Sequence, residues 1–385
     1  MRIFESRPAL RWVVPAVVVG VVGGTSLIAI TASANPALPD ETPQQLLVDL
    51  QQAKVDNFSG TVVQKSDLGL PELPGVGGGS SDTSLTSLIS GTHTLRVWSA
   101  GEAKQRLAIQ GTLGETDIIR NGTDVWNWTS RDNAATHTTL SGDHTAAAED
   151  LPSDAPKTPQ EAADRVLAAI DPTTTVTTNP AVEVAKRPAY ALVLEPKDDA
   201  DSLIGQVRIS VDGEKKVPLS VEVLAKDGTS VFSTEFSSVD FATPDDAYFQ
   251  FNPPSGTKVT EKTAPSIDKS DAAKKKAEAE QKAKAAQDDT KIVGSGWSSV
   301  VVAKGDFSSA DQSTPSGPNA DGSSSEGPGG DAASMKQVLA ALPKVSGTWG
   351  SGRLLSSKAF SVVITDDGRI AAGAVAPETL YKALG

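Results

Sequence analysis

Cysteine is absent from this chain of 385 residues, and histidine is scarce. Without cysteine there can be no disulfides, thiolate metal sites or cysteine nucleophiles, and no lipid can be attached through an N-terminal cysteine. The three histidines, His93, His137 and His144, lie far apart without the spacing of a metal-binding pair. We read His93 and His137 as ordinary polar residues of strands and His144 as a loop residue, and we predict no metal site.

Catalytic and phosphate-binding motifs are missing as well. The chain has no G-x-S-x-G elbow, no P-loop and no strand-linked G-x-G-x-x-G, and "GVGGGSS" lacks the lysine and helix that would follow a P-loop. We therefore predict no catalytic residue, no cofactor and no enzymatic activity. The net charge of −13 provides no basic surface for a phosphate backbone, which argues against nucleic acid as a partner.

The N-terminus has the pattern of an export signal. Three arginines precede an uncharged apolar run from Trp12 to Ile30, and "TASANP" suits signal-peptidase cleavage after Ala34. The run is close to the roughly 20 residues that cross a bilayer as a helix. Residues 1–34 are thus either a cleaved signal peptide or a retained anchor that holds the protein on the membrane. In both cases the rest of the chain lies outside the cytoplasm.

Two helices and many short strands are predicted for residues 35–259. The helices begin at Thr42 and Thr158, each followed by Pro-Gln, and extend to about Lys54 and Ile170. Alternating apolar and polar residues indicate about ten or eleven strands, with turns such as Asn121-Gly122 between them. The order predicts an α+β fold, a curved antiparallel sheet with the helices against its concave side.

A long segment separates the first two predicted strands. Residues 66–91, "SDLGLPELPGVGGGSSDTSLTSLISG", are rich in Gly, Pro and Ser but contain six leucine and isoleucine residues. Loops of this length are more often functional than incidental. We interpret the segment as a cover over the sheet, with plain disorder as the alternative.

A charged linker and a small second domain complete the chain. Residues 260–290 consist mainly of Ala, Lys, Glu, Asp and Gln and cannot form a core. Residues 291–385 contain a Ser/Gly/Pro-rich insert, residues 308–333, predicted to be disordered, then a hairpin turning at Asp367-Gly368 and a helix beginning at Pro377. A domain this small is expected to pack against the first domain or a partner.

The stretch "IIRNGTDVWNW" places two tryptophans on one strand face in a chain with few aromatic residues. Trp126 and Trp128 point to the same side because strand side chains alternate. The shared face could be core, a sugar-binding platform or the wall of an apolar pocket. A sugar platform is the least favoured because the stretch lies inside a continuous sheet, and the other two readings stay open.

Four segments, in the same order, resemble the bacterial lipoprotein-carrier fold shared by LolA, LolB, the mycobacterial LppX/LprG-type carriers and the regulator RseB (MucB). They are the first helix running into "DNFSGTVVQ", the "RNGTDVWNW" hairpin, the meander of residues 205–241 and the closing "PDDAYFQFNPPSGTKV". The tail "FSVVITDDGRIAAGAVAPETLYKAL" is similar to the small C-terminal domain of RseB. Two features depart from the family: no lipid-anchor cysteine is present, and the carrier's arginine near its third strand has only Lys104 and Arg106 as nearby counterparts.

The resemblance implies an incomplete barrel, lidded by helices, around a cavity for acyl chains. Burial of methylene groups can hold such a ligand without charged or catalytic groups, at roughly 0.8 kcal/mol each. On this basis we predict that the cavity wall or lid comprises ten residues: Leu46, Leu50, Phe58, Leu85, Leu88, Ile89, Trp98, Trp126, Trp128 and Leu167.

Three functions remain in view, in order of preference. The first is a non-enzymatic envelope protein that binds the acyl chains of a lipid or lipoprotein, including a carrier role. The second is an RseB-like sensor that binds an anti-sigma factor or another membrane protein. The third is a structural envelope protein whose half-barrel is filled by its own side chains.

Overall fold

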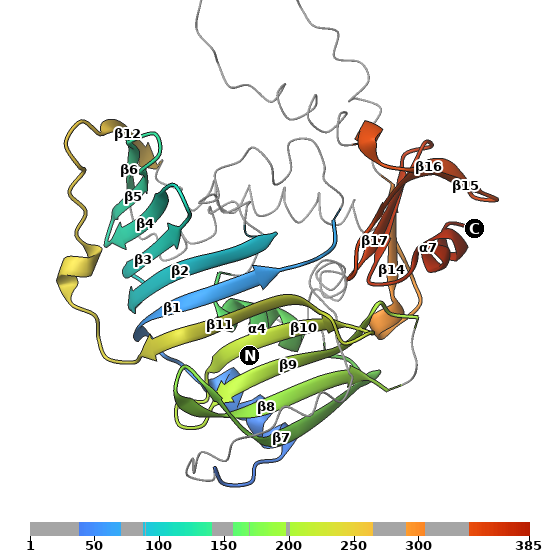
Figure 1. The fold of residues 1–385 in the computed structure, drawn as a ribbon, viewed down its shortest axis with the longest axis horizontal. Helices are drawn as coiled ribbons and strands as arrows, with labels where there is room; N and C mark the ends of the chain where they lie inside the picture. The colour runs from blue at the N-terminus through green and yellow to red at the C-terminus, as the bar shows by residue number, and fades with distance from the viewer. Residues whose placement is uncertain are drawn as a thin grey trace, which may run out of the picture.

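The computed structural model describes residues 38–70, 88, 90–140, 157–168, 170–197, 201–264, 290–304 and 339–385 (Figure 1). The predicted signal segment, Leu85, Ile89, most of the linker and the predicted insert 308–333 lie outside these ranges. Within them, none of the helices is long and apolar enough to cross a membrane.

A single open sheet of 12 strands forms the larger part of the described structure. Its strands run in the order β12-β6-β5-β4-β3-β2-β1-β11-β10-β9-β8-β7, so the first and last strands do not close into a barrel (Figure 1). Their bounds are β1 (Asn57–Ser66), β2 (Gly91–Ala100), β3 (Lys104–Gln110), β4 (Glu115–Asn121), β5 (Asp124–Thr129), β6 (Ala134–Leu140), β7 (Thr174–Val184), β8 (Arg187–Pro196), β9 (Ile204–Asp212), β10 (Pro218–Ala225), β11 (Ser230–Asp240) and β12 (Lys258–Ala264).

Two helices lie against one face of this sheet, which we call the helix-bearing face. They are α3 (Pro43–Gln52) and α4 (Pro159–Ala168). Thr42 and Gln45 form the complete predicted capping box of α3, and Thr158 Oγ1 accepts a hydrogen bond from the Glu161 amide at the start of α4. The helices pack mainly on β7, β10 and β11.

The strand register extends this face across the sheet. Val221 pairs with Ile209 and Ile209 with Leu192, while Val62 pairs with Leu95 and Leu95 with Ile109. All six side chains are buried. The alternation of apolar and polar residues in the sequence thus becomes one continuous apolar surface.

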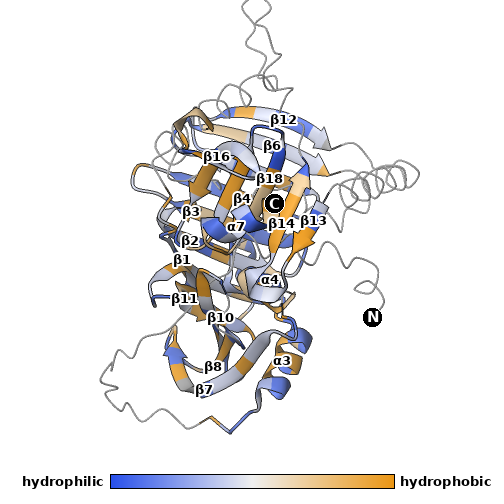
Figure 2. Cartoon of the chain, turned by 90° about the vertical axis from the view of Figure 1, so that its right-hand side faces the viewer, coloured by the Kyte–Doolittle hydropathy of each residue, from blue (hydrophilic) through white to orange (hydrophobic). Residues whose placement is uncertain are grey.

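A second sheet of six strands, in the order β13-β14-β18-β17-β16-β15, packs beside the first (Figure 1, right). Its strands are β13 (Thr290–Val293), β14 (Val300–Lys304), β15 (Lys344–Gly347), β16 (Gly350–Ser356), β17 (Ser361–Thr365) and β18 (Arg369–Gly373). The closing helix α7 (Pro377–Leu384) packs on β14, β17 and β18, and Figure 2 shows the apolar character of β14 beneath it.

The two sheets share contacts and part of one core. The Leu203 amide donates to the Ala374 carbonyl at 2.8 Å, and Ser202 forms an isolated bridge with Val375. Trp297, in the 3-10 helix η5 (Gly296–Ser298), donates from Nε1 to Thr174 Oγ1 at 2.9 Å and packs against the core under α3 and α4. The small sheet is therefore docked onto the large one.

The predicted class, α+β with an open curved sheet covered by helices and a smaller C-terminal unit, is confirmed. The large sheet has one strand more than predicted, since β12 pairs in parallel with β6. Its sequence, KVTEKTA, has no apolar alternation because the strand is held by backbone pairing at the edge of the sheet, where the side chains of residues 258–263 are exposed. It ends at Ala264, five residues beyond the predicted boundary at Val259.

Candidate functional site

The space between the helices and the sheet is filled by packed side chains. Leu46 and Leu50 of α3 are buried among Leu192, Ile209 and other residues of β8–β11, and the partly buried Leu167 of α4 packs on the same cluster. In the described residues this part of the half-barrel interior is ordinary core. The structure therefore brings three of the predicted cavity residues together, as members of a packed cluster.

Leu88 and Phe58 belong to a second cluster on the helix-bearing face. Leu88 is fully buried with Val62, Leu95 and Ile109, and its carbonyl accepts a hydrogen bond from Gln64 Nε2 at 2.8 Å. Phe58 meets Phe236 edge to face at 6.2 Å between ring centres. Leu88, one of the described residues of the predicted cover, does lie over the sheet, next to the start of β2.

A pocket of about 560 Å³ opens where β1 ends and β2 and β11 begin. Its described lining residues are Lys65 to Leu70, Ser90 to Thr92 and Ser230. Leu68 and Leu70 supply apolar wall, and Leu68 continues into the core cluster under the helices. The serine and threonine side chains and Lys65 add hydroxyl groups and one cation, so the pocket combines an apolar side with a polar rim.

The small sheet holds the chain that forms one wall of this pocket. The Lys358 amide donates to the Leu68 carbonyl at 2.8 Å, and Lys358 Nζ pairs with Asp67 Oδ2 at 2.5 Å. Gly69 has φ +62°, and a Cβ there would meet the Lys358 side chain at 2.9 Å. Ala359 and Phe360 follow Lys358 into the core under the helices. The pocket wall and the small sheet are thus fastened together.

The three predicted tryptophans lie on the opposite face of the sheet. Trp98 pairs across the strands with Arg106, Arg106 with Ile119, and Ile119 with Trp126, so all four share the face away from the helices. Trp126 and Trp128 share that face, as predicted. The structure does not bring the tryptophans together with Leu46, Leu50 or Leu88.

A segment that we call the strap, residues 245–257, covers these tryptophans (Figure 1, left). It contains the 3-10 helix η4 (Asp246–Phe249) and leads from β11 to β12. Tyr248 stacks on Trp98 at 5.4 Å, and the ring of Phe251 lies 5.2 Å from Trp126 and 6.0 Å from Trp128. The strand face that Trp126 and Trp128 share is therefore covered by the strap.

Charged groups fix the strap to the sheet. Arg106 binds the buried Asp117 through two hydrogen bonds of 2.6 and 3.2 Å, lies over the Trp98 ring, and donates to the Tyr248 carbonyl at 3.4 Å. Lys104 pairs with Asp246 at 2.7 Å. Lys104 and Arg106, the two residues nearest to the carrier's arginine in the sequence, therefore contact the strap on the face away from the helices.

Glu115, on the same face as Asp117, has a raised pKa. Burial is the main cause and the Asp117 carboxylate adds to it, while Arg106 and Arg96 act in the opposite direction. Glu115 and Asp117 therefore both lie close to the positive charge of Arg106.

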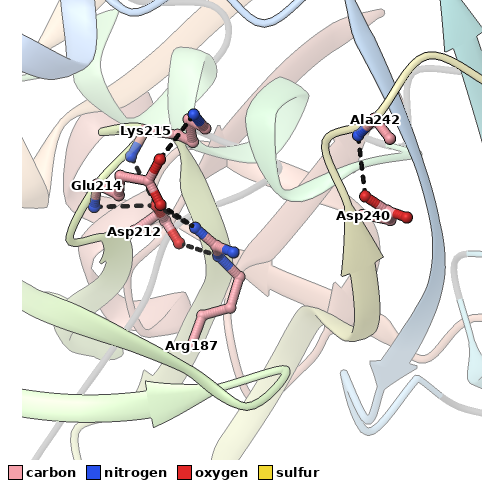
Figure 3. A network of polar contacts seen from close by, with 6 residues as sticks. All are labelled: Arg187, Asp212, Glu214, Lys215, Asp240 and Ala242. Atoms are coloured by element: carbon pink, nitrogen blue, oxygen red, sulfur yellow. Dashed lines mark hydrogen bonds and ion pairs between the residues drawn. The ribbon is translucent and has the colours of Figure 1, made fainter.

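A polar network closes the end of the sheet opposite the pocket (Figure 3). Asp212, fully buried, accepts hydrogen bonds from the Glu214 and Lys215 amides and from the guanidinium of Arg187, which also lies over the Phe241 ring. Burial alone would raise the pKa of Asp212, but these donors, Arg187 first, lower it below its usual value. The Asp-Gly turn predicted here is thus also an ion-pair site.

Sequence reasoning missed the residues whose contacts are long-range. Lys358 and Asp67 are separated by 291 positions, and nothing in their local sequence indicates the pair. His137, read as an ordinary strand residue, does lie on β6, but it also contacts two carboxylates there. Leu85 and Ile89 are outside the described residues.

No protein-family profile matches the chain, and no curated protein sequence matches it. Solved structures with similarity to it include the complex of MucA and MucB from Pseudomonas aeruginosa, at 14% identity and a TM-score of 0.38 over 89% of this chain and 96% of that one. A LolA superfamily protein, NE2245 from Nitrosomonas europaea, is matched at 13% identity and a TM-score of 0.23, over 55% of this chain and 99% of the other. An uncharacterised conserved protein from Thermus thermophilus is matched at 12% identity and a TM-score of 0.30, over 57% and 98%.

Proposed function

We propose that this chain is a non-enzymatic, extracytoplasmic envelope protein that binds the acyl part of a lipid or lipoprotein. The observation that carries the proposal is the pocket of about 560 Å³ at the end of β1, β2 and β11, with Leu68 and Leu70 in its wall. Its size is within the roughly 300–1,000 Å³ of small-molecule sites.

The lining chemistry suits an amphipathic ligand. An acyl chain against Leu68 and Leu70 gains roughly 0.8 kcal/mol for each methylene that leaves water. Lys65 and the hydroxyl groups of Ser90 and Thr92 suit the oxygens of an ester or head group at the rim. Binding of this kind requires no catalytic residue in the pocket.

The packed core limits where the acyl chain of a ligand can lie. Leu46, Leu50 and Leu192 are packed in one buried cluster beneath α3, so among the described residues an acyl chain could enter there only if a helix moved. We therefore propose binding at the pocket rather than along the floor under the helices. Of the predicted cavity residues that are described, Leu88 lies two positions before Ser90 of the pocket lining.

The test is lipid retention by the purified protein without residues 1–34. Organic extraction followed by mass spectrometry should release lipid in a ratio near one per chain. Thr92→Trp would fill the pocket and should reduce that ratio severalfold. Thr177→Trp, at an exposed site on β7 away from the pocket, is the matched control and should leave it unchanged. No stoichiometric lipid from the parent protein, or equal retention in both variants, would refute the proposal.

A second candidate is a lipid-tuned regulator that binds a membrane protein, such as the anti-sigma factor that the RseB resemblance implies. The observation favouring it is the Lys358 contact, which fastens the small sheet to the pocket wall. A MucB protein has been solved in complex with MucA. The expected result is that an envelope membrane protein is recovered with the lipid-loaded or the delipidated form, but not with both. Equal recovery with both forms contradicts this candidate.

The packed cluster under α3 and α4 favours a third candidate, a structural envelope protein that binds no lipid. The extraction experiment separates it from the first, since a structural protein would release none.

A further inference from the structure

His137 occupies a site that the proposed lipid binding does not use. It lies on β6 with its ring stacked on Trp126, 4.1 Å between ring centres and 9° from parallel. Nδ1 is 2.7 Å from Glu261 Oε2 on β12, and Nε2 is 2.9 Å from Asp124 Oδ1 on β5. One imidazole ring thus connects three neighbouring strands on the face away from the helices.

The geometry selects the protonated ring. A neutral imidazole has one N–H donor, so one of its nitrogens would direct a lone pair at a carboxylate oxygen. Only the imidazolium donates to both carboxylates, and its charge is also favourable over the Trp126 ring. Burial by itself lowers the pKa of His137, but the hydrogen bonds to Asp124 and Glu261 outweigh it, and the net shift is upward.

The groups around His137 offer little opposition to its charge. Asp124 faces it from β5 and Glu261 from β12, and the ring packed against it from β5 is the uncharged Trp126. The strap contributes the uncharged Phe251, against Trp126. Lys262 follows Glu261 directly, so strand alternation turns it to the other face.

β12 has few other attachments. Its side chains from Lys258 to Thr263 are exposed, and in the described chain it pairs with β6 alone, at the edge of the sheet. Thr257, just before it, adds a hydrogen bond to Asn133. Among the described residues, the contact of His137 with Glu261 is thus the main side-chain link between β12 and the sheet, and β12 anchors the far end of the strap.

We propose that protonated His137 is a pH-sensitive clasp that fastens β12, and with it the end of the strap, to the large sheet. The clasp is closed in acidic medium and loosens as the pH rises and the ring loses one of its two donors. The sign follows from the upward shift: the stabilisation is complete below the ordinary histidine value of 6.5 and disappears as the pH rises through the higher folded-state pKa.

Hydrogen exchange with mass spectrometry on the full chain tests this directly. The protection factor of residues 258–264, corrected for the intrinsic pH dependence of exchange, should fall about three- to tenfold between about pH 5 and about pH 8.5, as expected for losing one charge-assisted hydrogen bond. Peptides from β8 and β9 should not change, because their hydrogen bonds lie under the helices.

Variants separate the clasp from general loosening. His137→Gln should have no pH dependence in this segment, and Glu261→Gln should reduce the dependence while altering only an exposed side chain. Glu235→Gln, an exposed glutamate on β11, is the matched control and should behave as the parent. Unchanged pH dependence in Glu261→Gln, or none in the parent protein, would overturn the proposal. The hydrogen-exchange experiment does not depend on lipid binding. A protein that retains no lipid could therefore still show the pH dependence expected here.

Discussion

The two halves of the large sheet are covered on opposite faces and by different means. We define the helix-covered half as β7–β11 with α3 and α4, and the strap-covered half as β2–β6 with the strap and β12. In the first, aliphatic side chains from both helices and five strands merge into one cluster. In the second, aromatic rings meet a segment with only one short helix, and the Lys104–Asp246 ion pair fixes that segment to the sheet.

The two faces of this open sheet are therefore covered by different kinds of interaction. The helix-covered half is stabilised mainly by non-directional burial, which is large and does not itself depend on pH, and the buried Arg187–Asp212 ion pair lies at one end of it. The strap-covered half relies on stacking and charge, which are weaker, directional and sensitive to protonation. We therefore expect the first half to determine global stability and the second to open locally.

Leu46→Ala should have the largest effect. The side chain is fully buried between α3 and the sheet, so its loss leaves a cavity in the shared core. The free energy of unfolding should fall by about 3 kcal/mol in urea denaturation. Leu113→Ala, at a loop position that is 79% exposed, is the control and should change it by less than about 0.5 kcal/mol. Similar values for the two variants would mean that the helix does not pack as described.

Asp212→Asn should come next, because it leaves the Arg187 charge without its buried partner (Figure 3). We expect a loss of about 2 kcal/mol at neutral pH. The pKa of Asp212 is lowered in the fold, so its contribution is present above 3.8, the value of a free carboxyl, and is lost as the pH falls through the folded-state pKa.

Urea denaturation of the parent protein and of Asp212→Asn at a series of pH values shows how much Asp212 contributes to the acid dependence of stability. The variant should lose less stability than the parent between neutral pH and acid, because the group that titrates is gone. Asp240→Asn, which removes an exposed carboxylate that accepts only from the Ala242 amide in Figure 3, should retain the acid dependence of the parent. An identical acid profile in Asp212→Asn and the parent would show that this network does not contribute.

Phe249→Ala tests the strap-covered half. Phe249 is buried against Trp98 and Ala108, and a buried phenylalanine usually costs about 3–5 kcal/mol on truncation. We expect only about 1.5 kcal/mol globally, because the strap can detach by itself, together with a marked increase in hydrogen exchange of residues 245–257. A global loss equal to that of Leu46→Ala, without local exchange, would remove the distinction between the halves.

Thr42→Ala should have the smallest effect, about 1 kcal/mol, through loss of the α3 capping box. Thermal unfolding should show a small decrease in melting temperature, and Thr42→Ser should restore most of it since the hydroxyl returns. No recovery with serine would show that the cap is not the cause.

The helix-covered half could be predicted well from the sequence because its determinants are local. Thr42-Pro43 and Thr158-Pro159 mark both helix starts, and alternation along strands such as β10 identifies the buried face. The terminal residues differ by only a few positions, at Gln52 and Ala168 rather than Lys54 and Ile170.

The strap-covered half was harder because its pattern is ambiguous. Alternation shows that Trp126 and Trp128 share a face, but either face of a strand can be covered, and only tertiary contacts decide which. β12 has no apolar pattern and pairs in parallel with a strand more than 120 residues earlier. The pocket likewise depends on segments far apart in the chain, such as those of Ser66, Ser90 and Ser230.

The most direct test of the proposed function is to locate a bound lipid. The purified protein would be loaded with a fatty acid that carries a photoreactive group on its chain, irradiated and digested, and the labelled peptides would be identified by mass spectrometry. The pocket predicts labelling within residues 65–70 and 90–92, reduced in Thr92→Trp and unchanged in Thr177→Trp. Labelling confined to residues elsewhere, such as Trp126 and Trp128 beneath the strap, or no labelling at all, would contradict it.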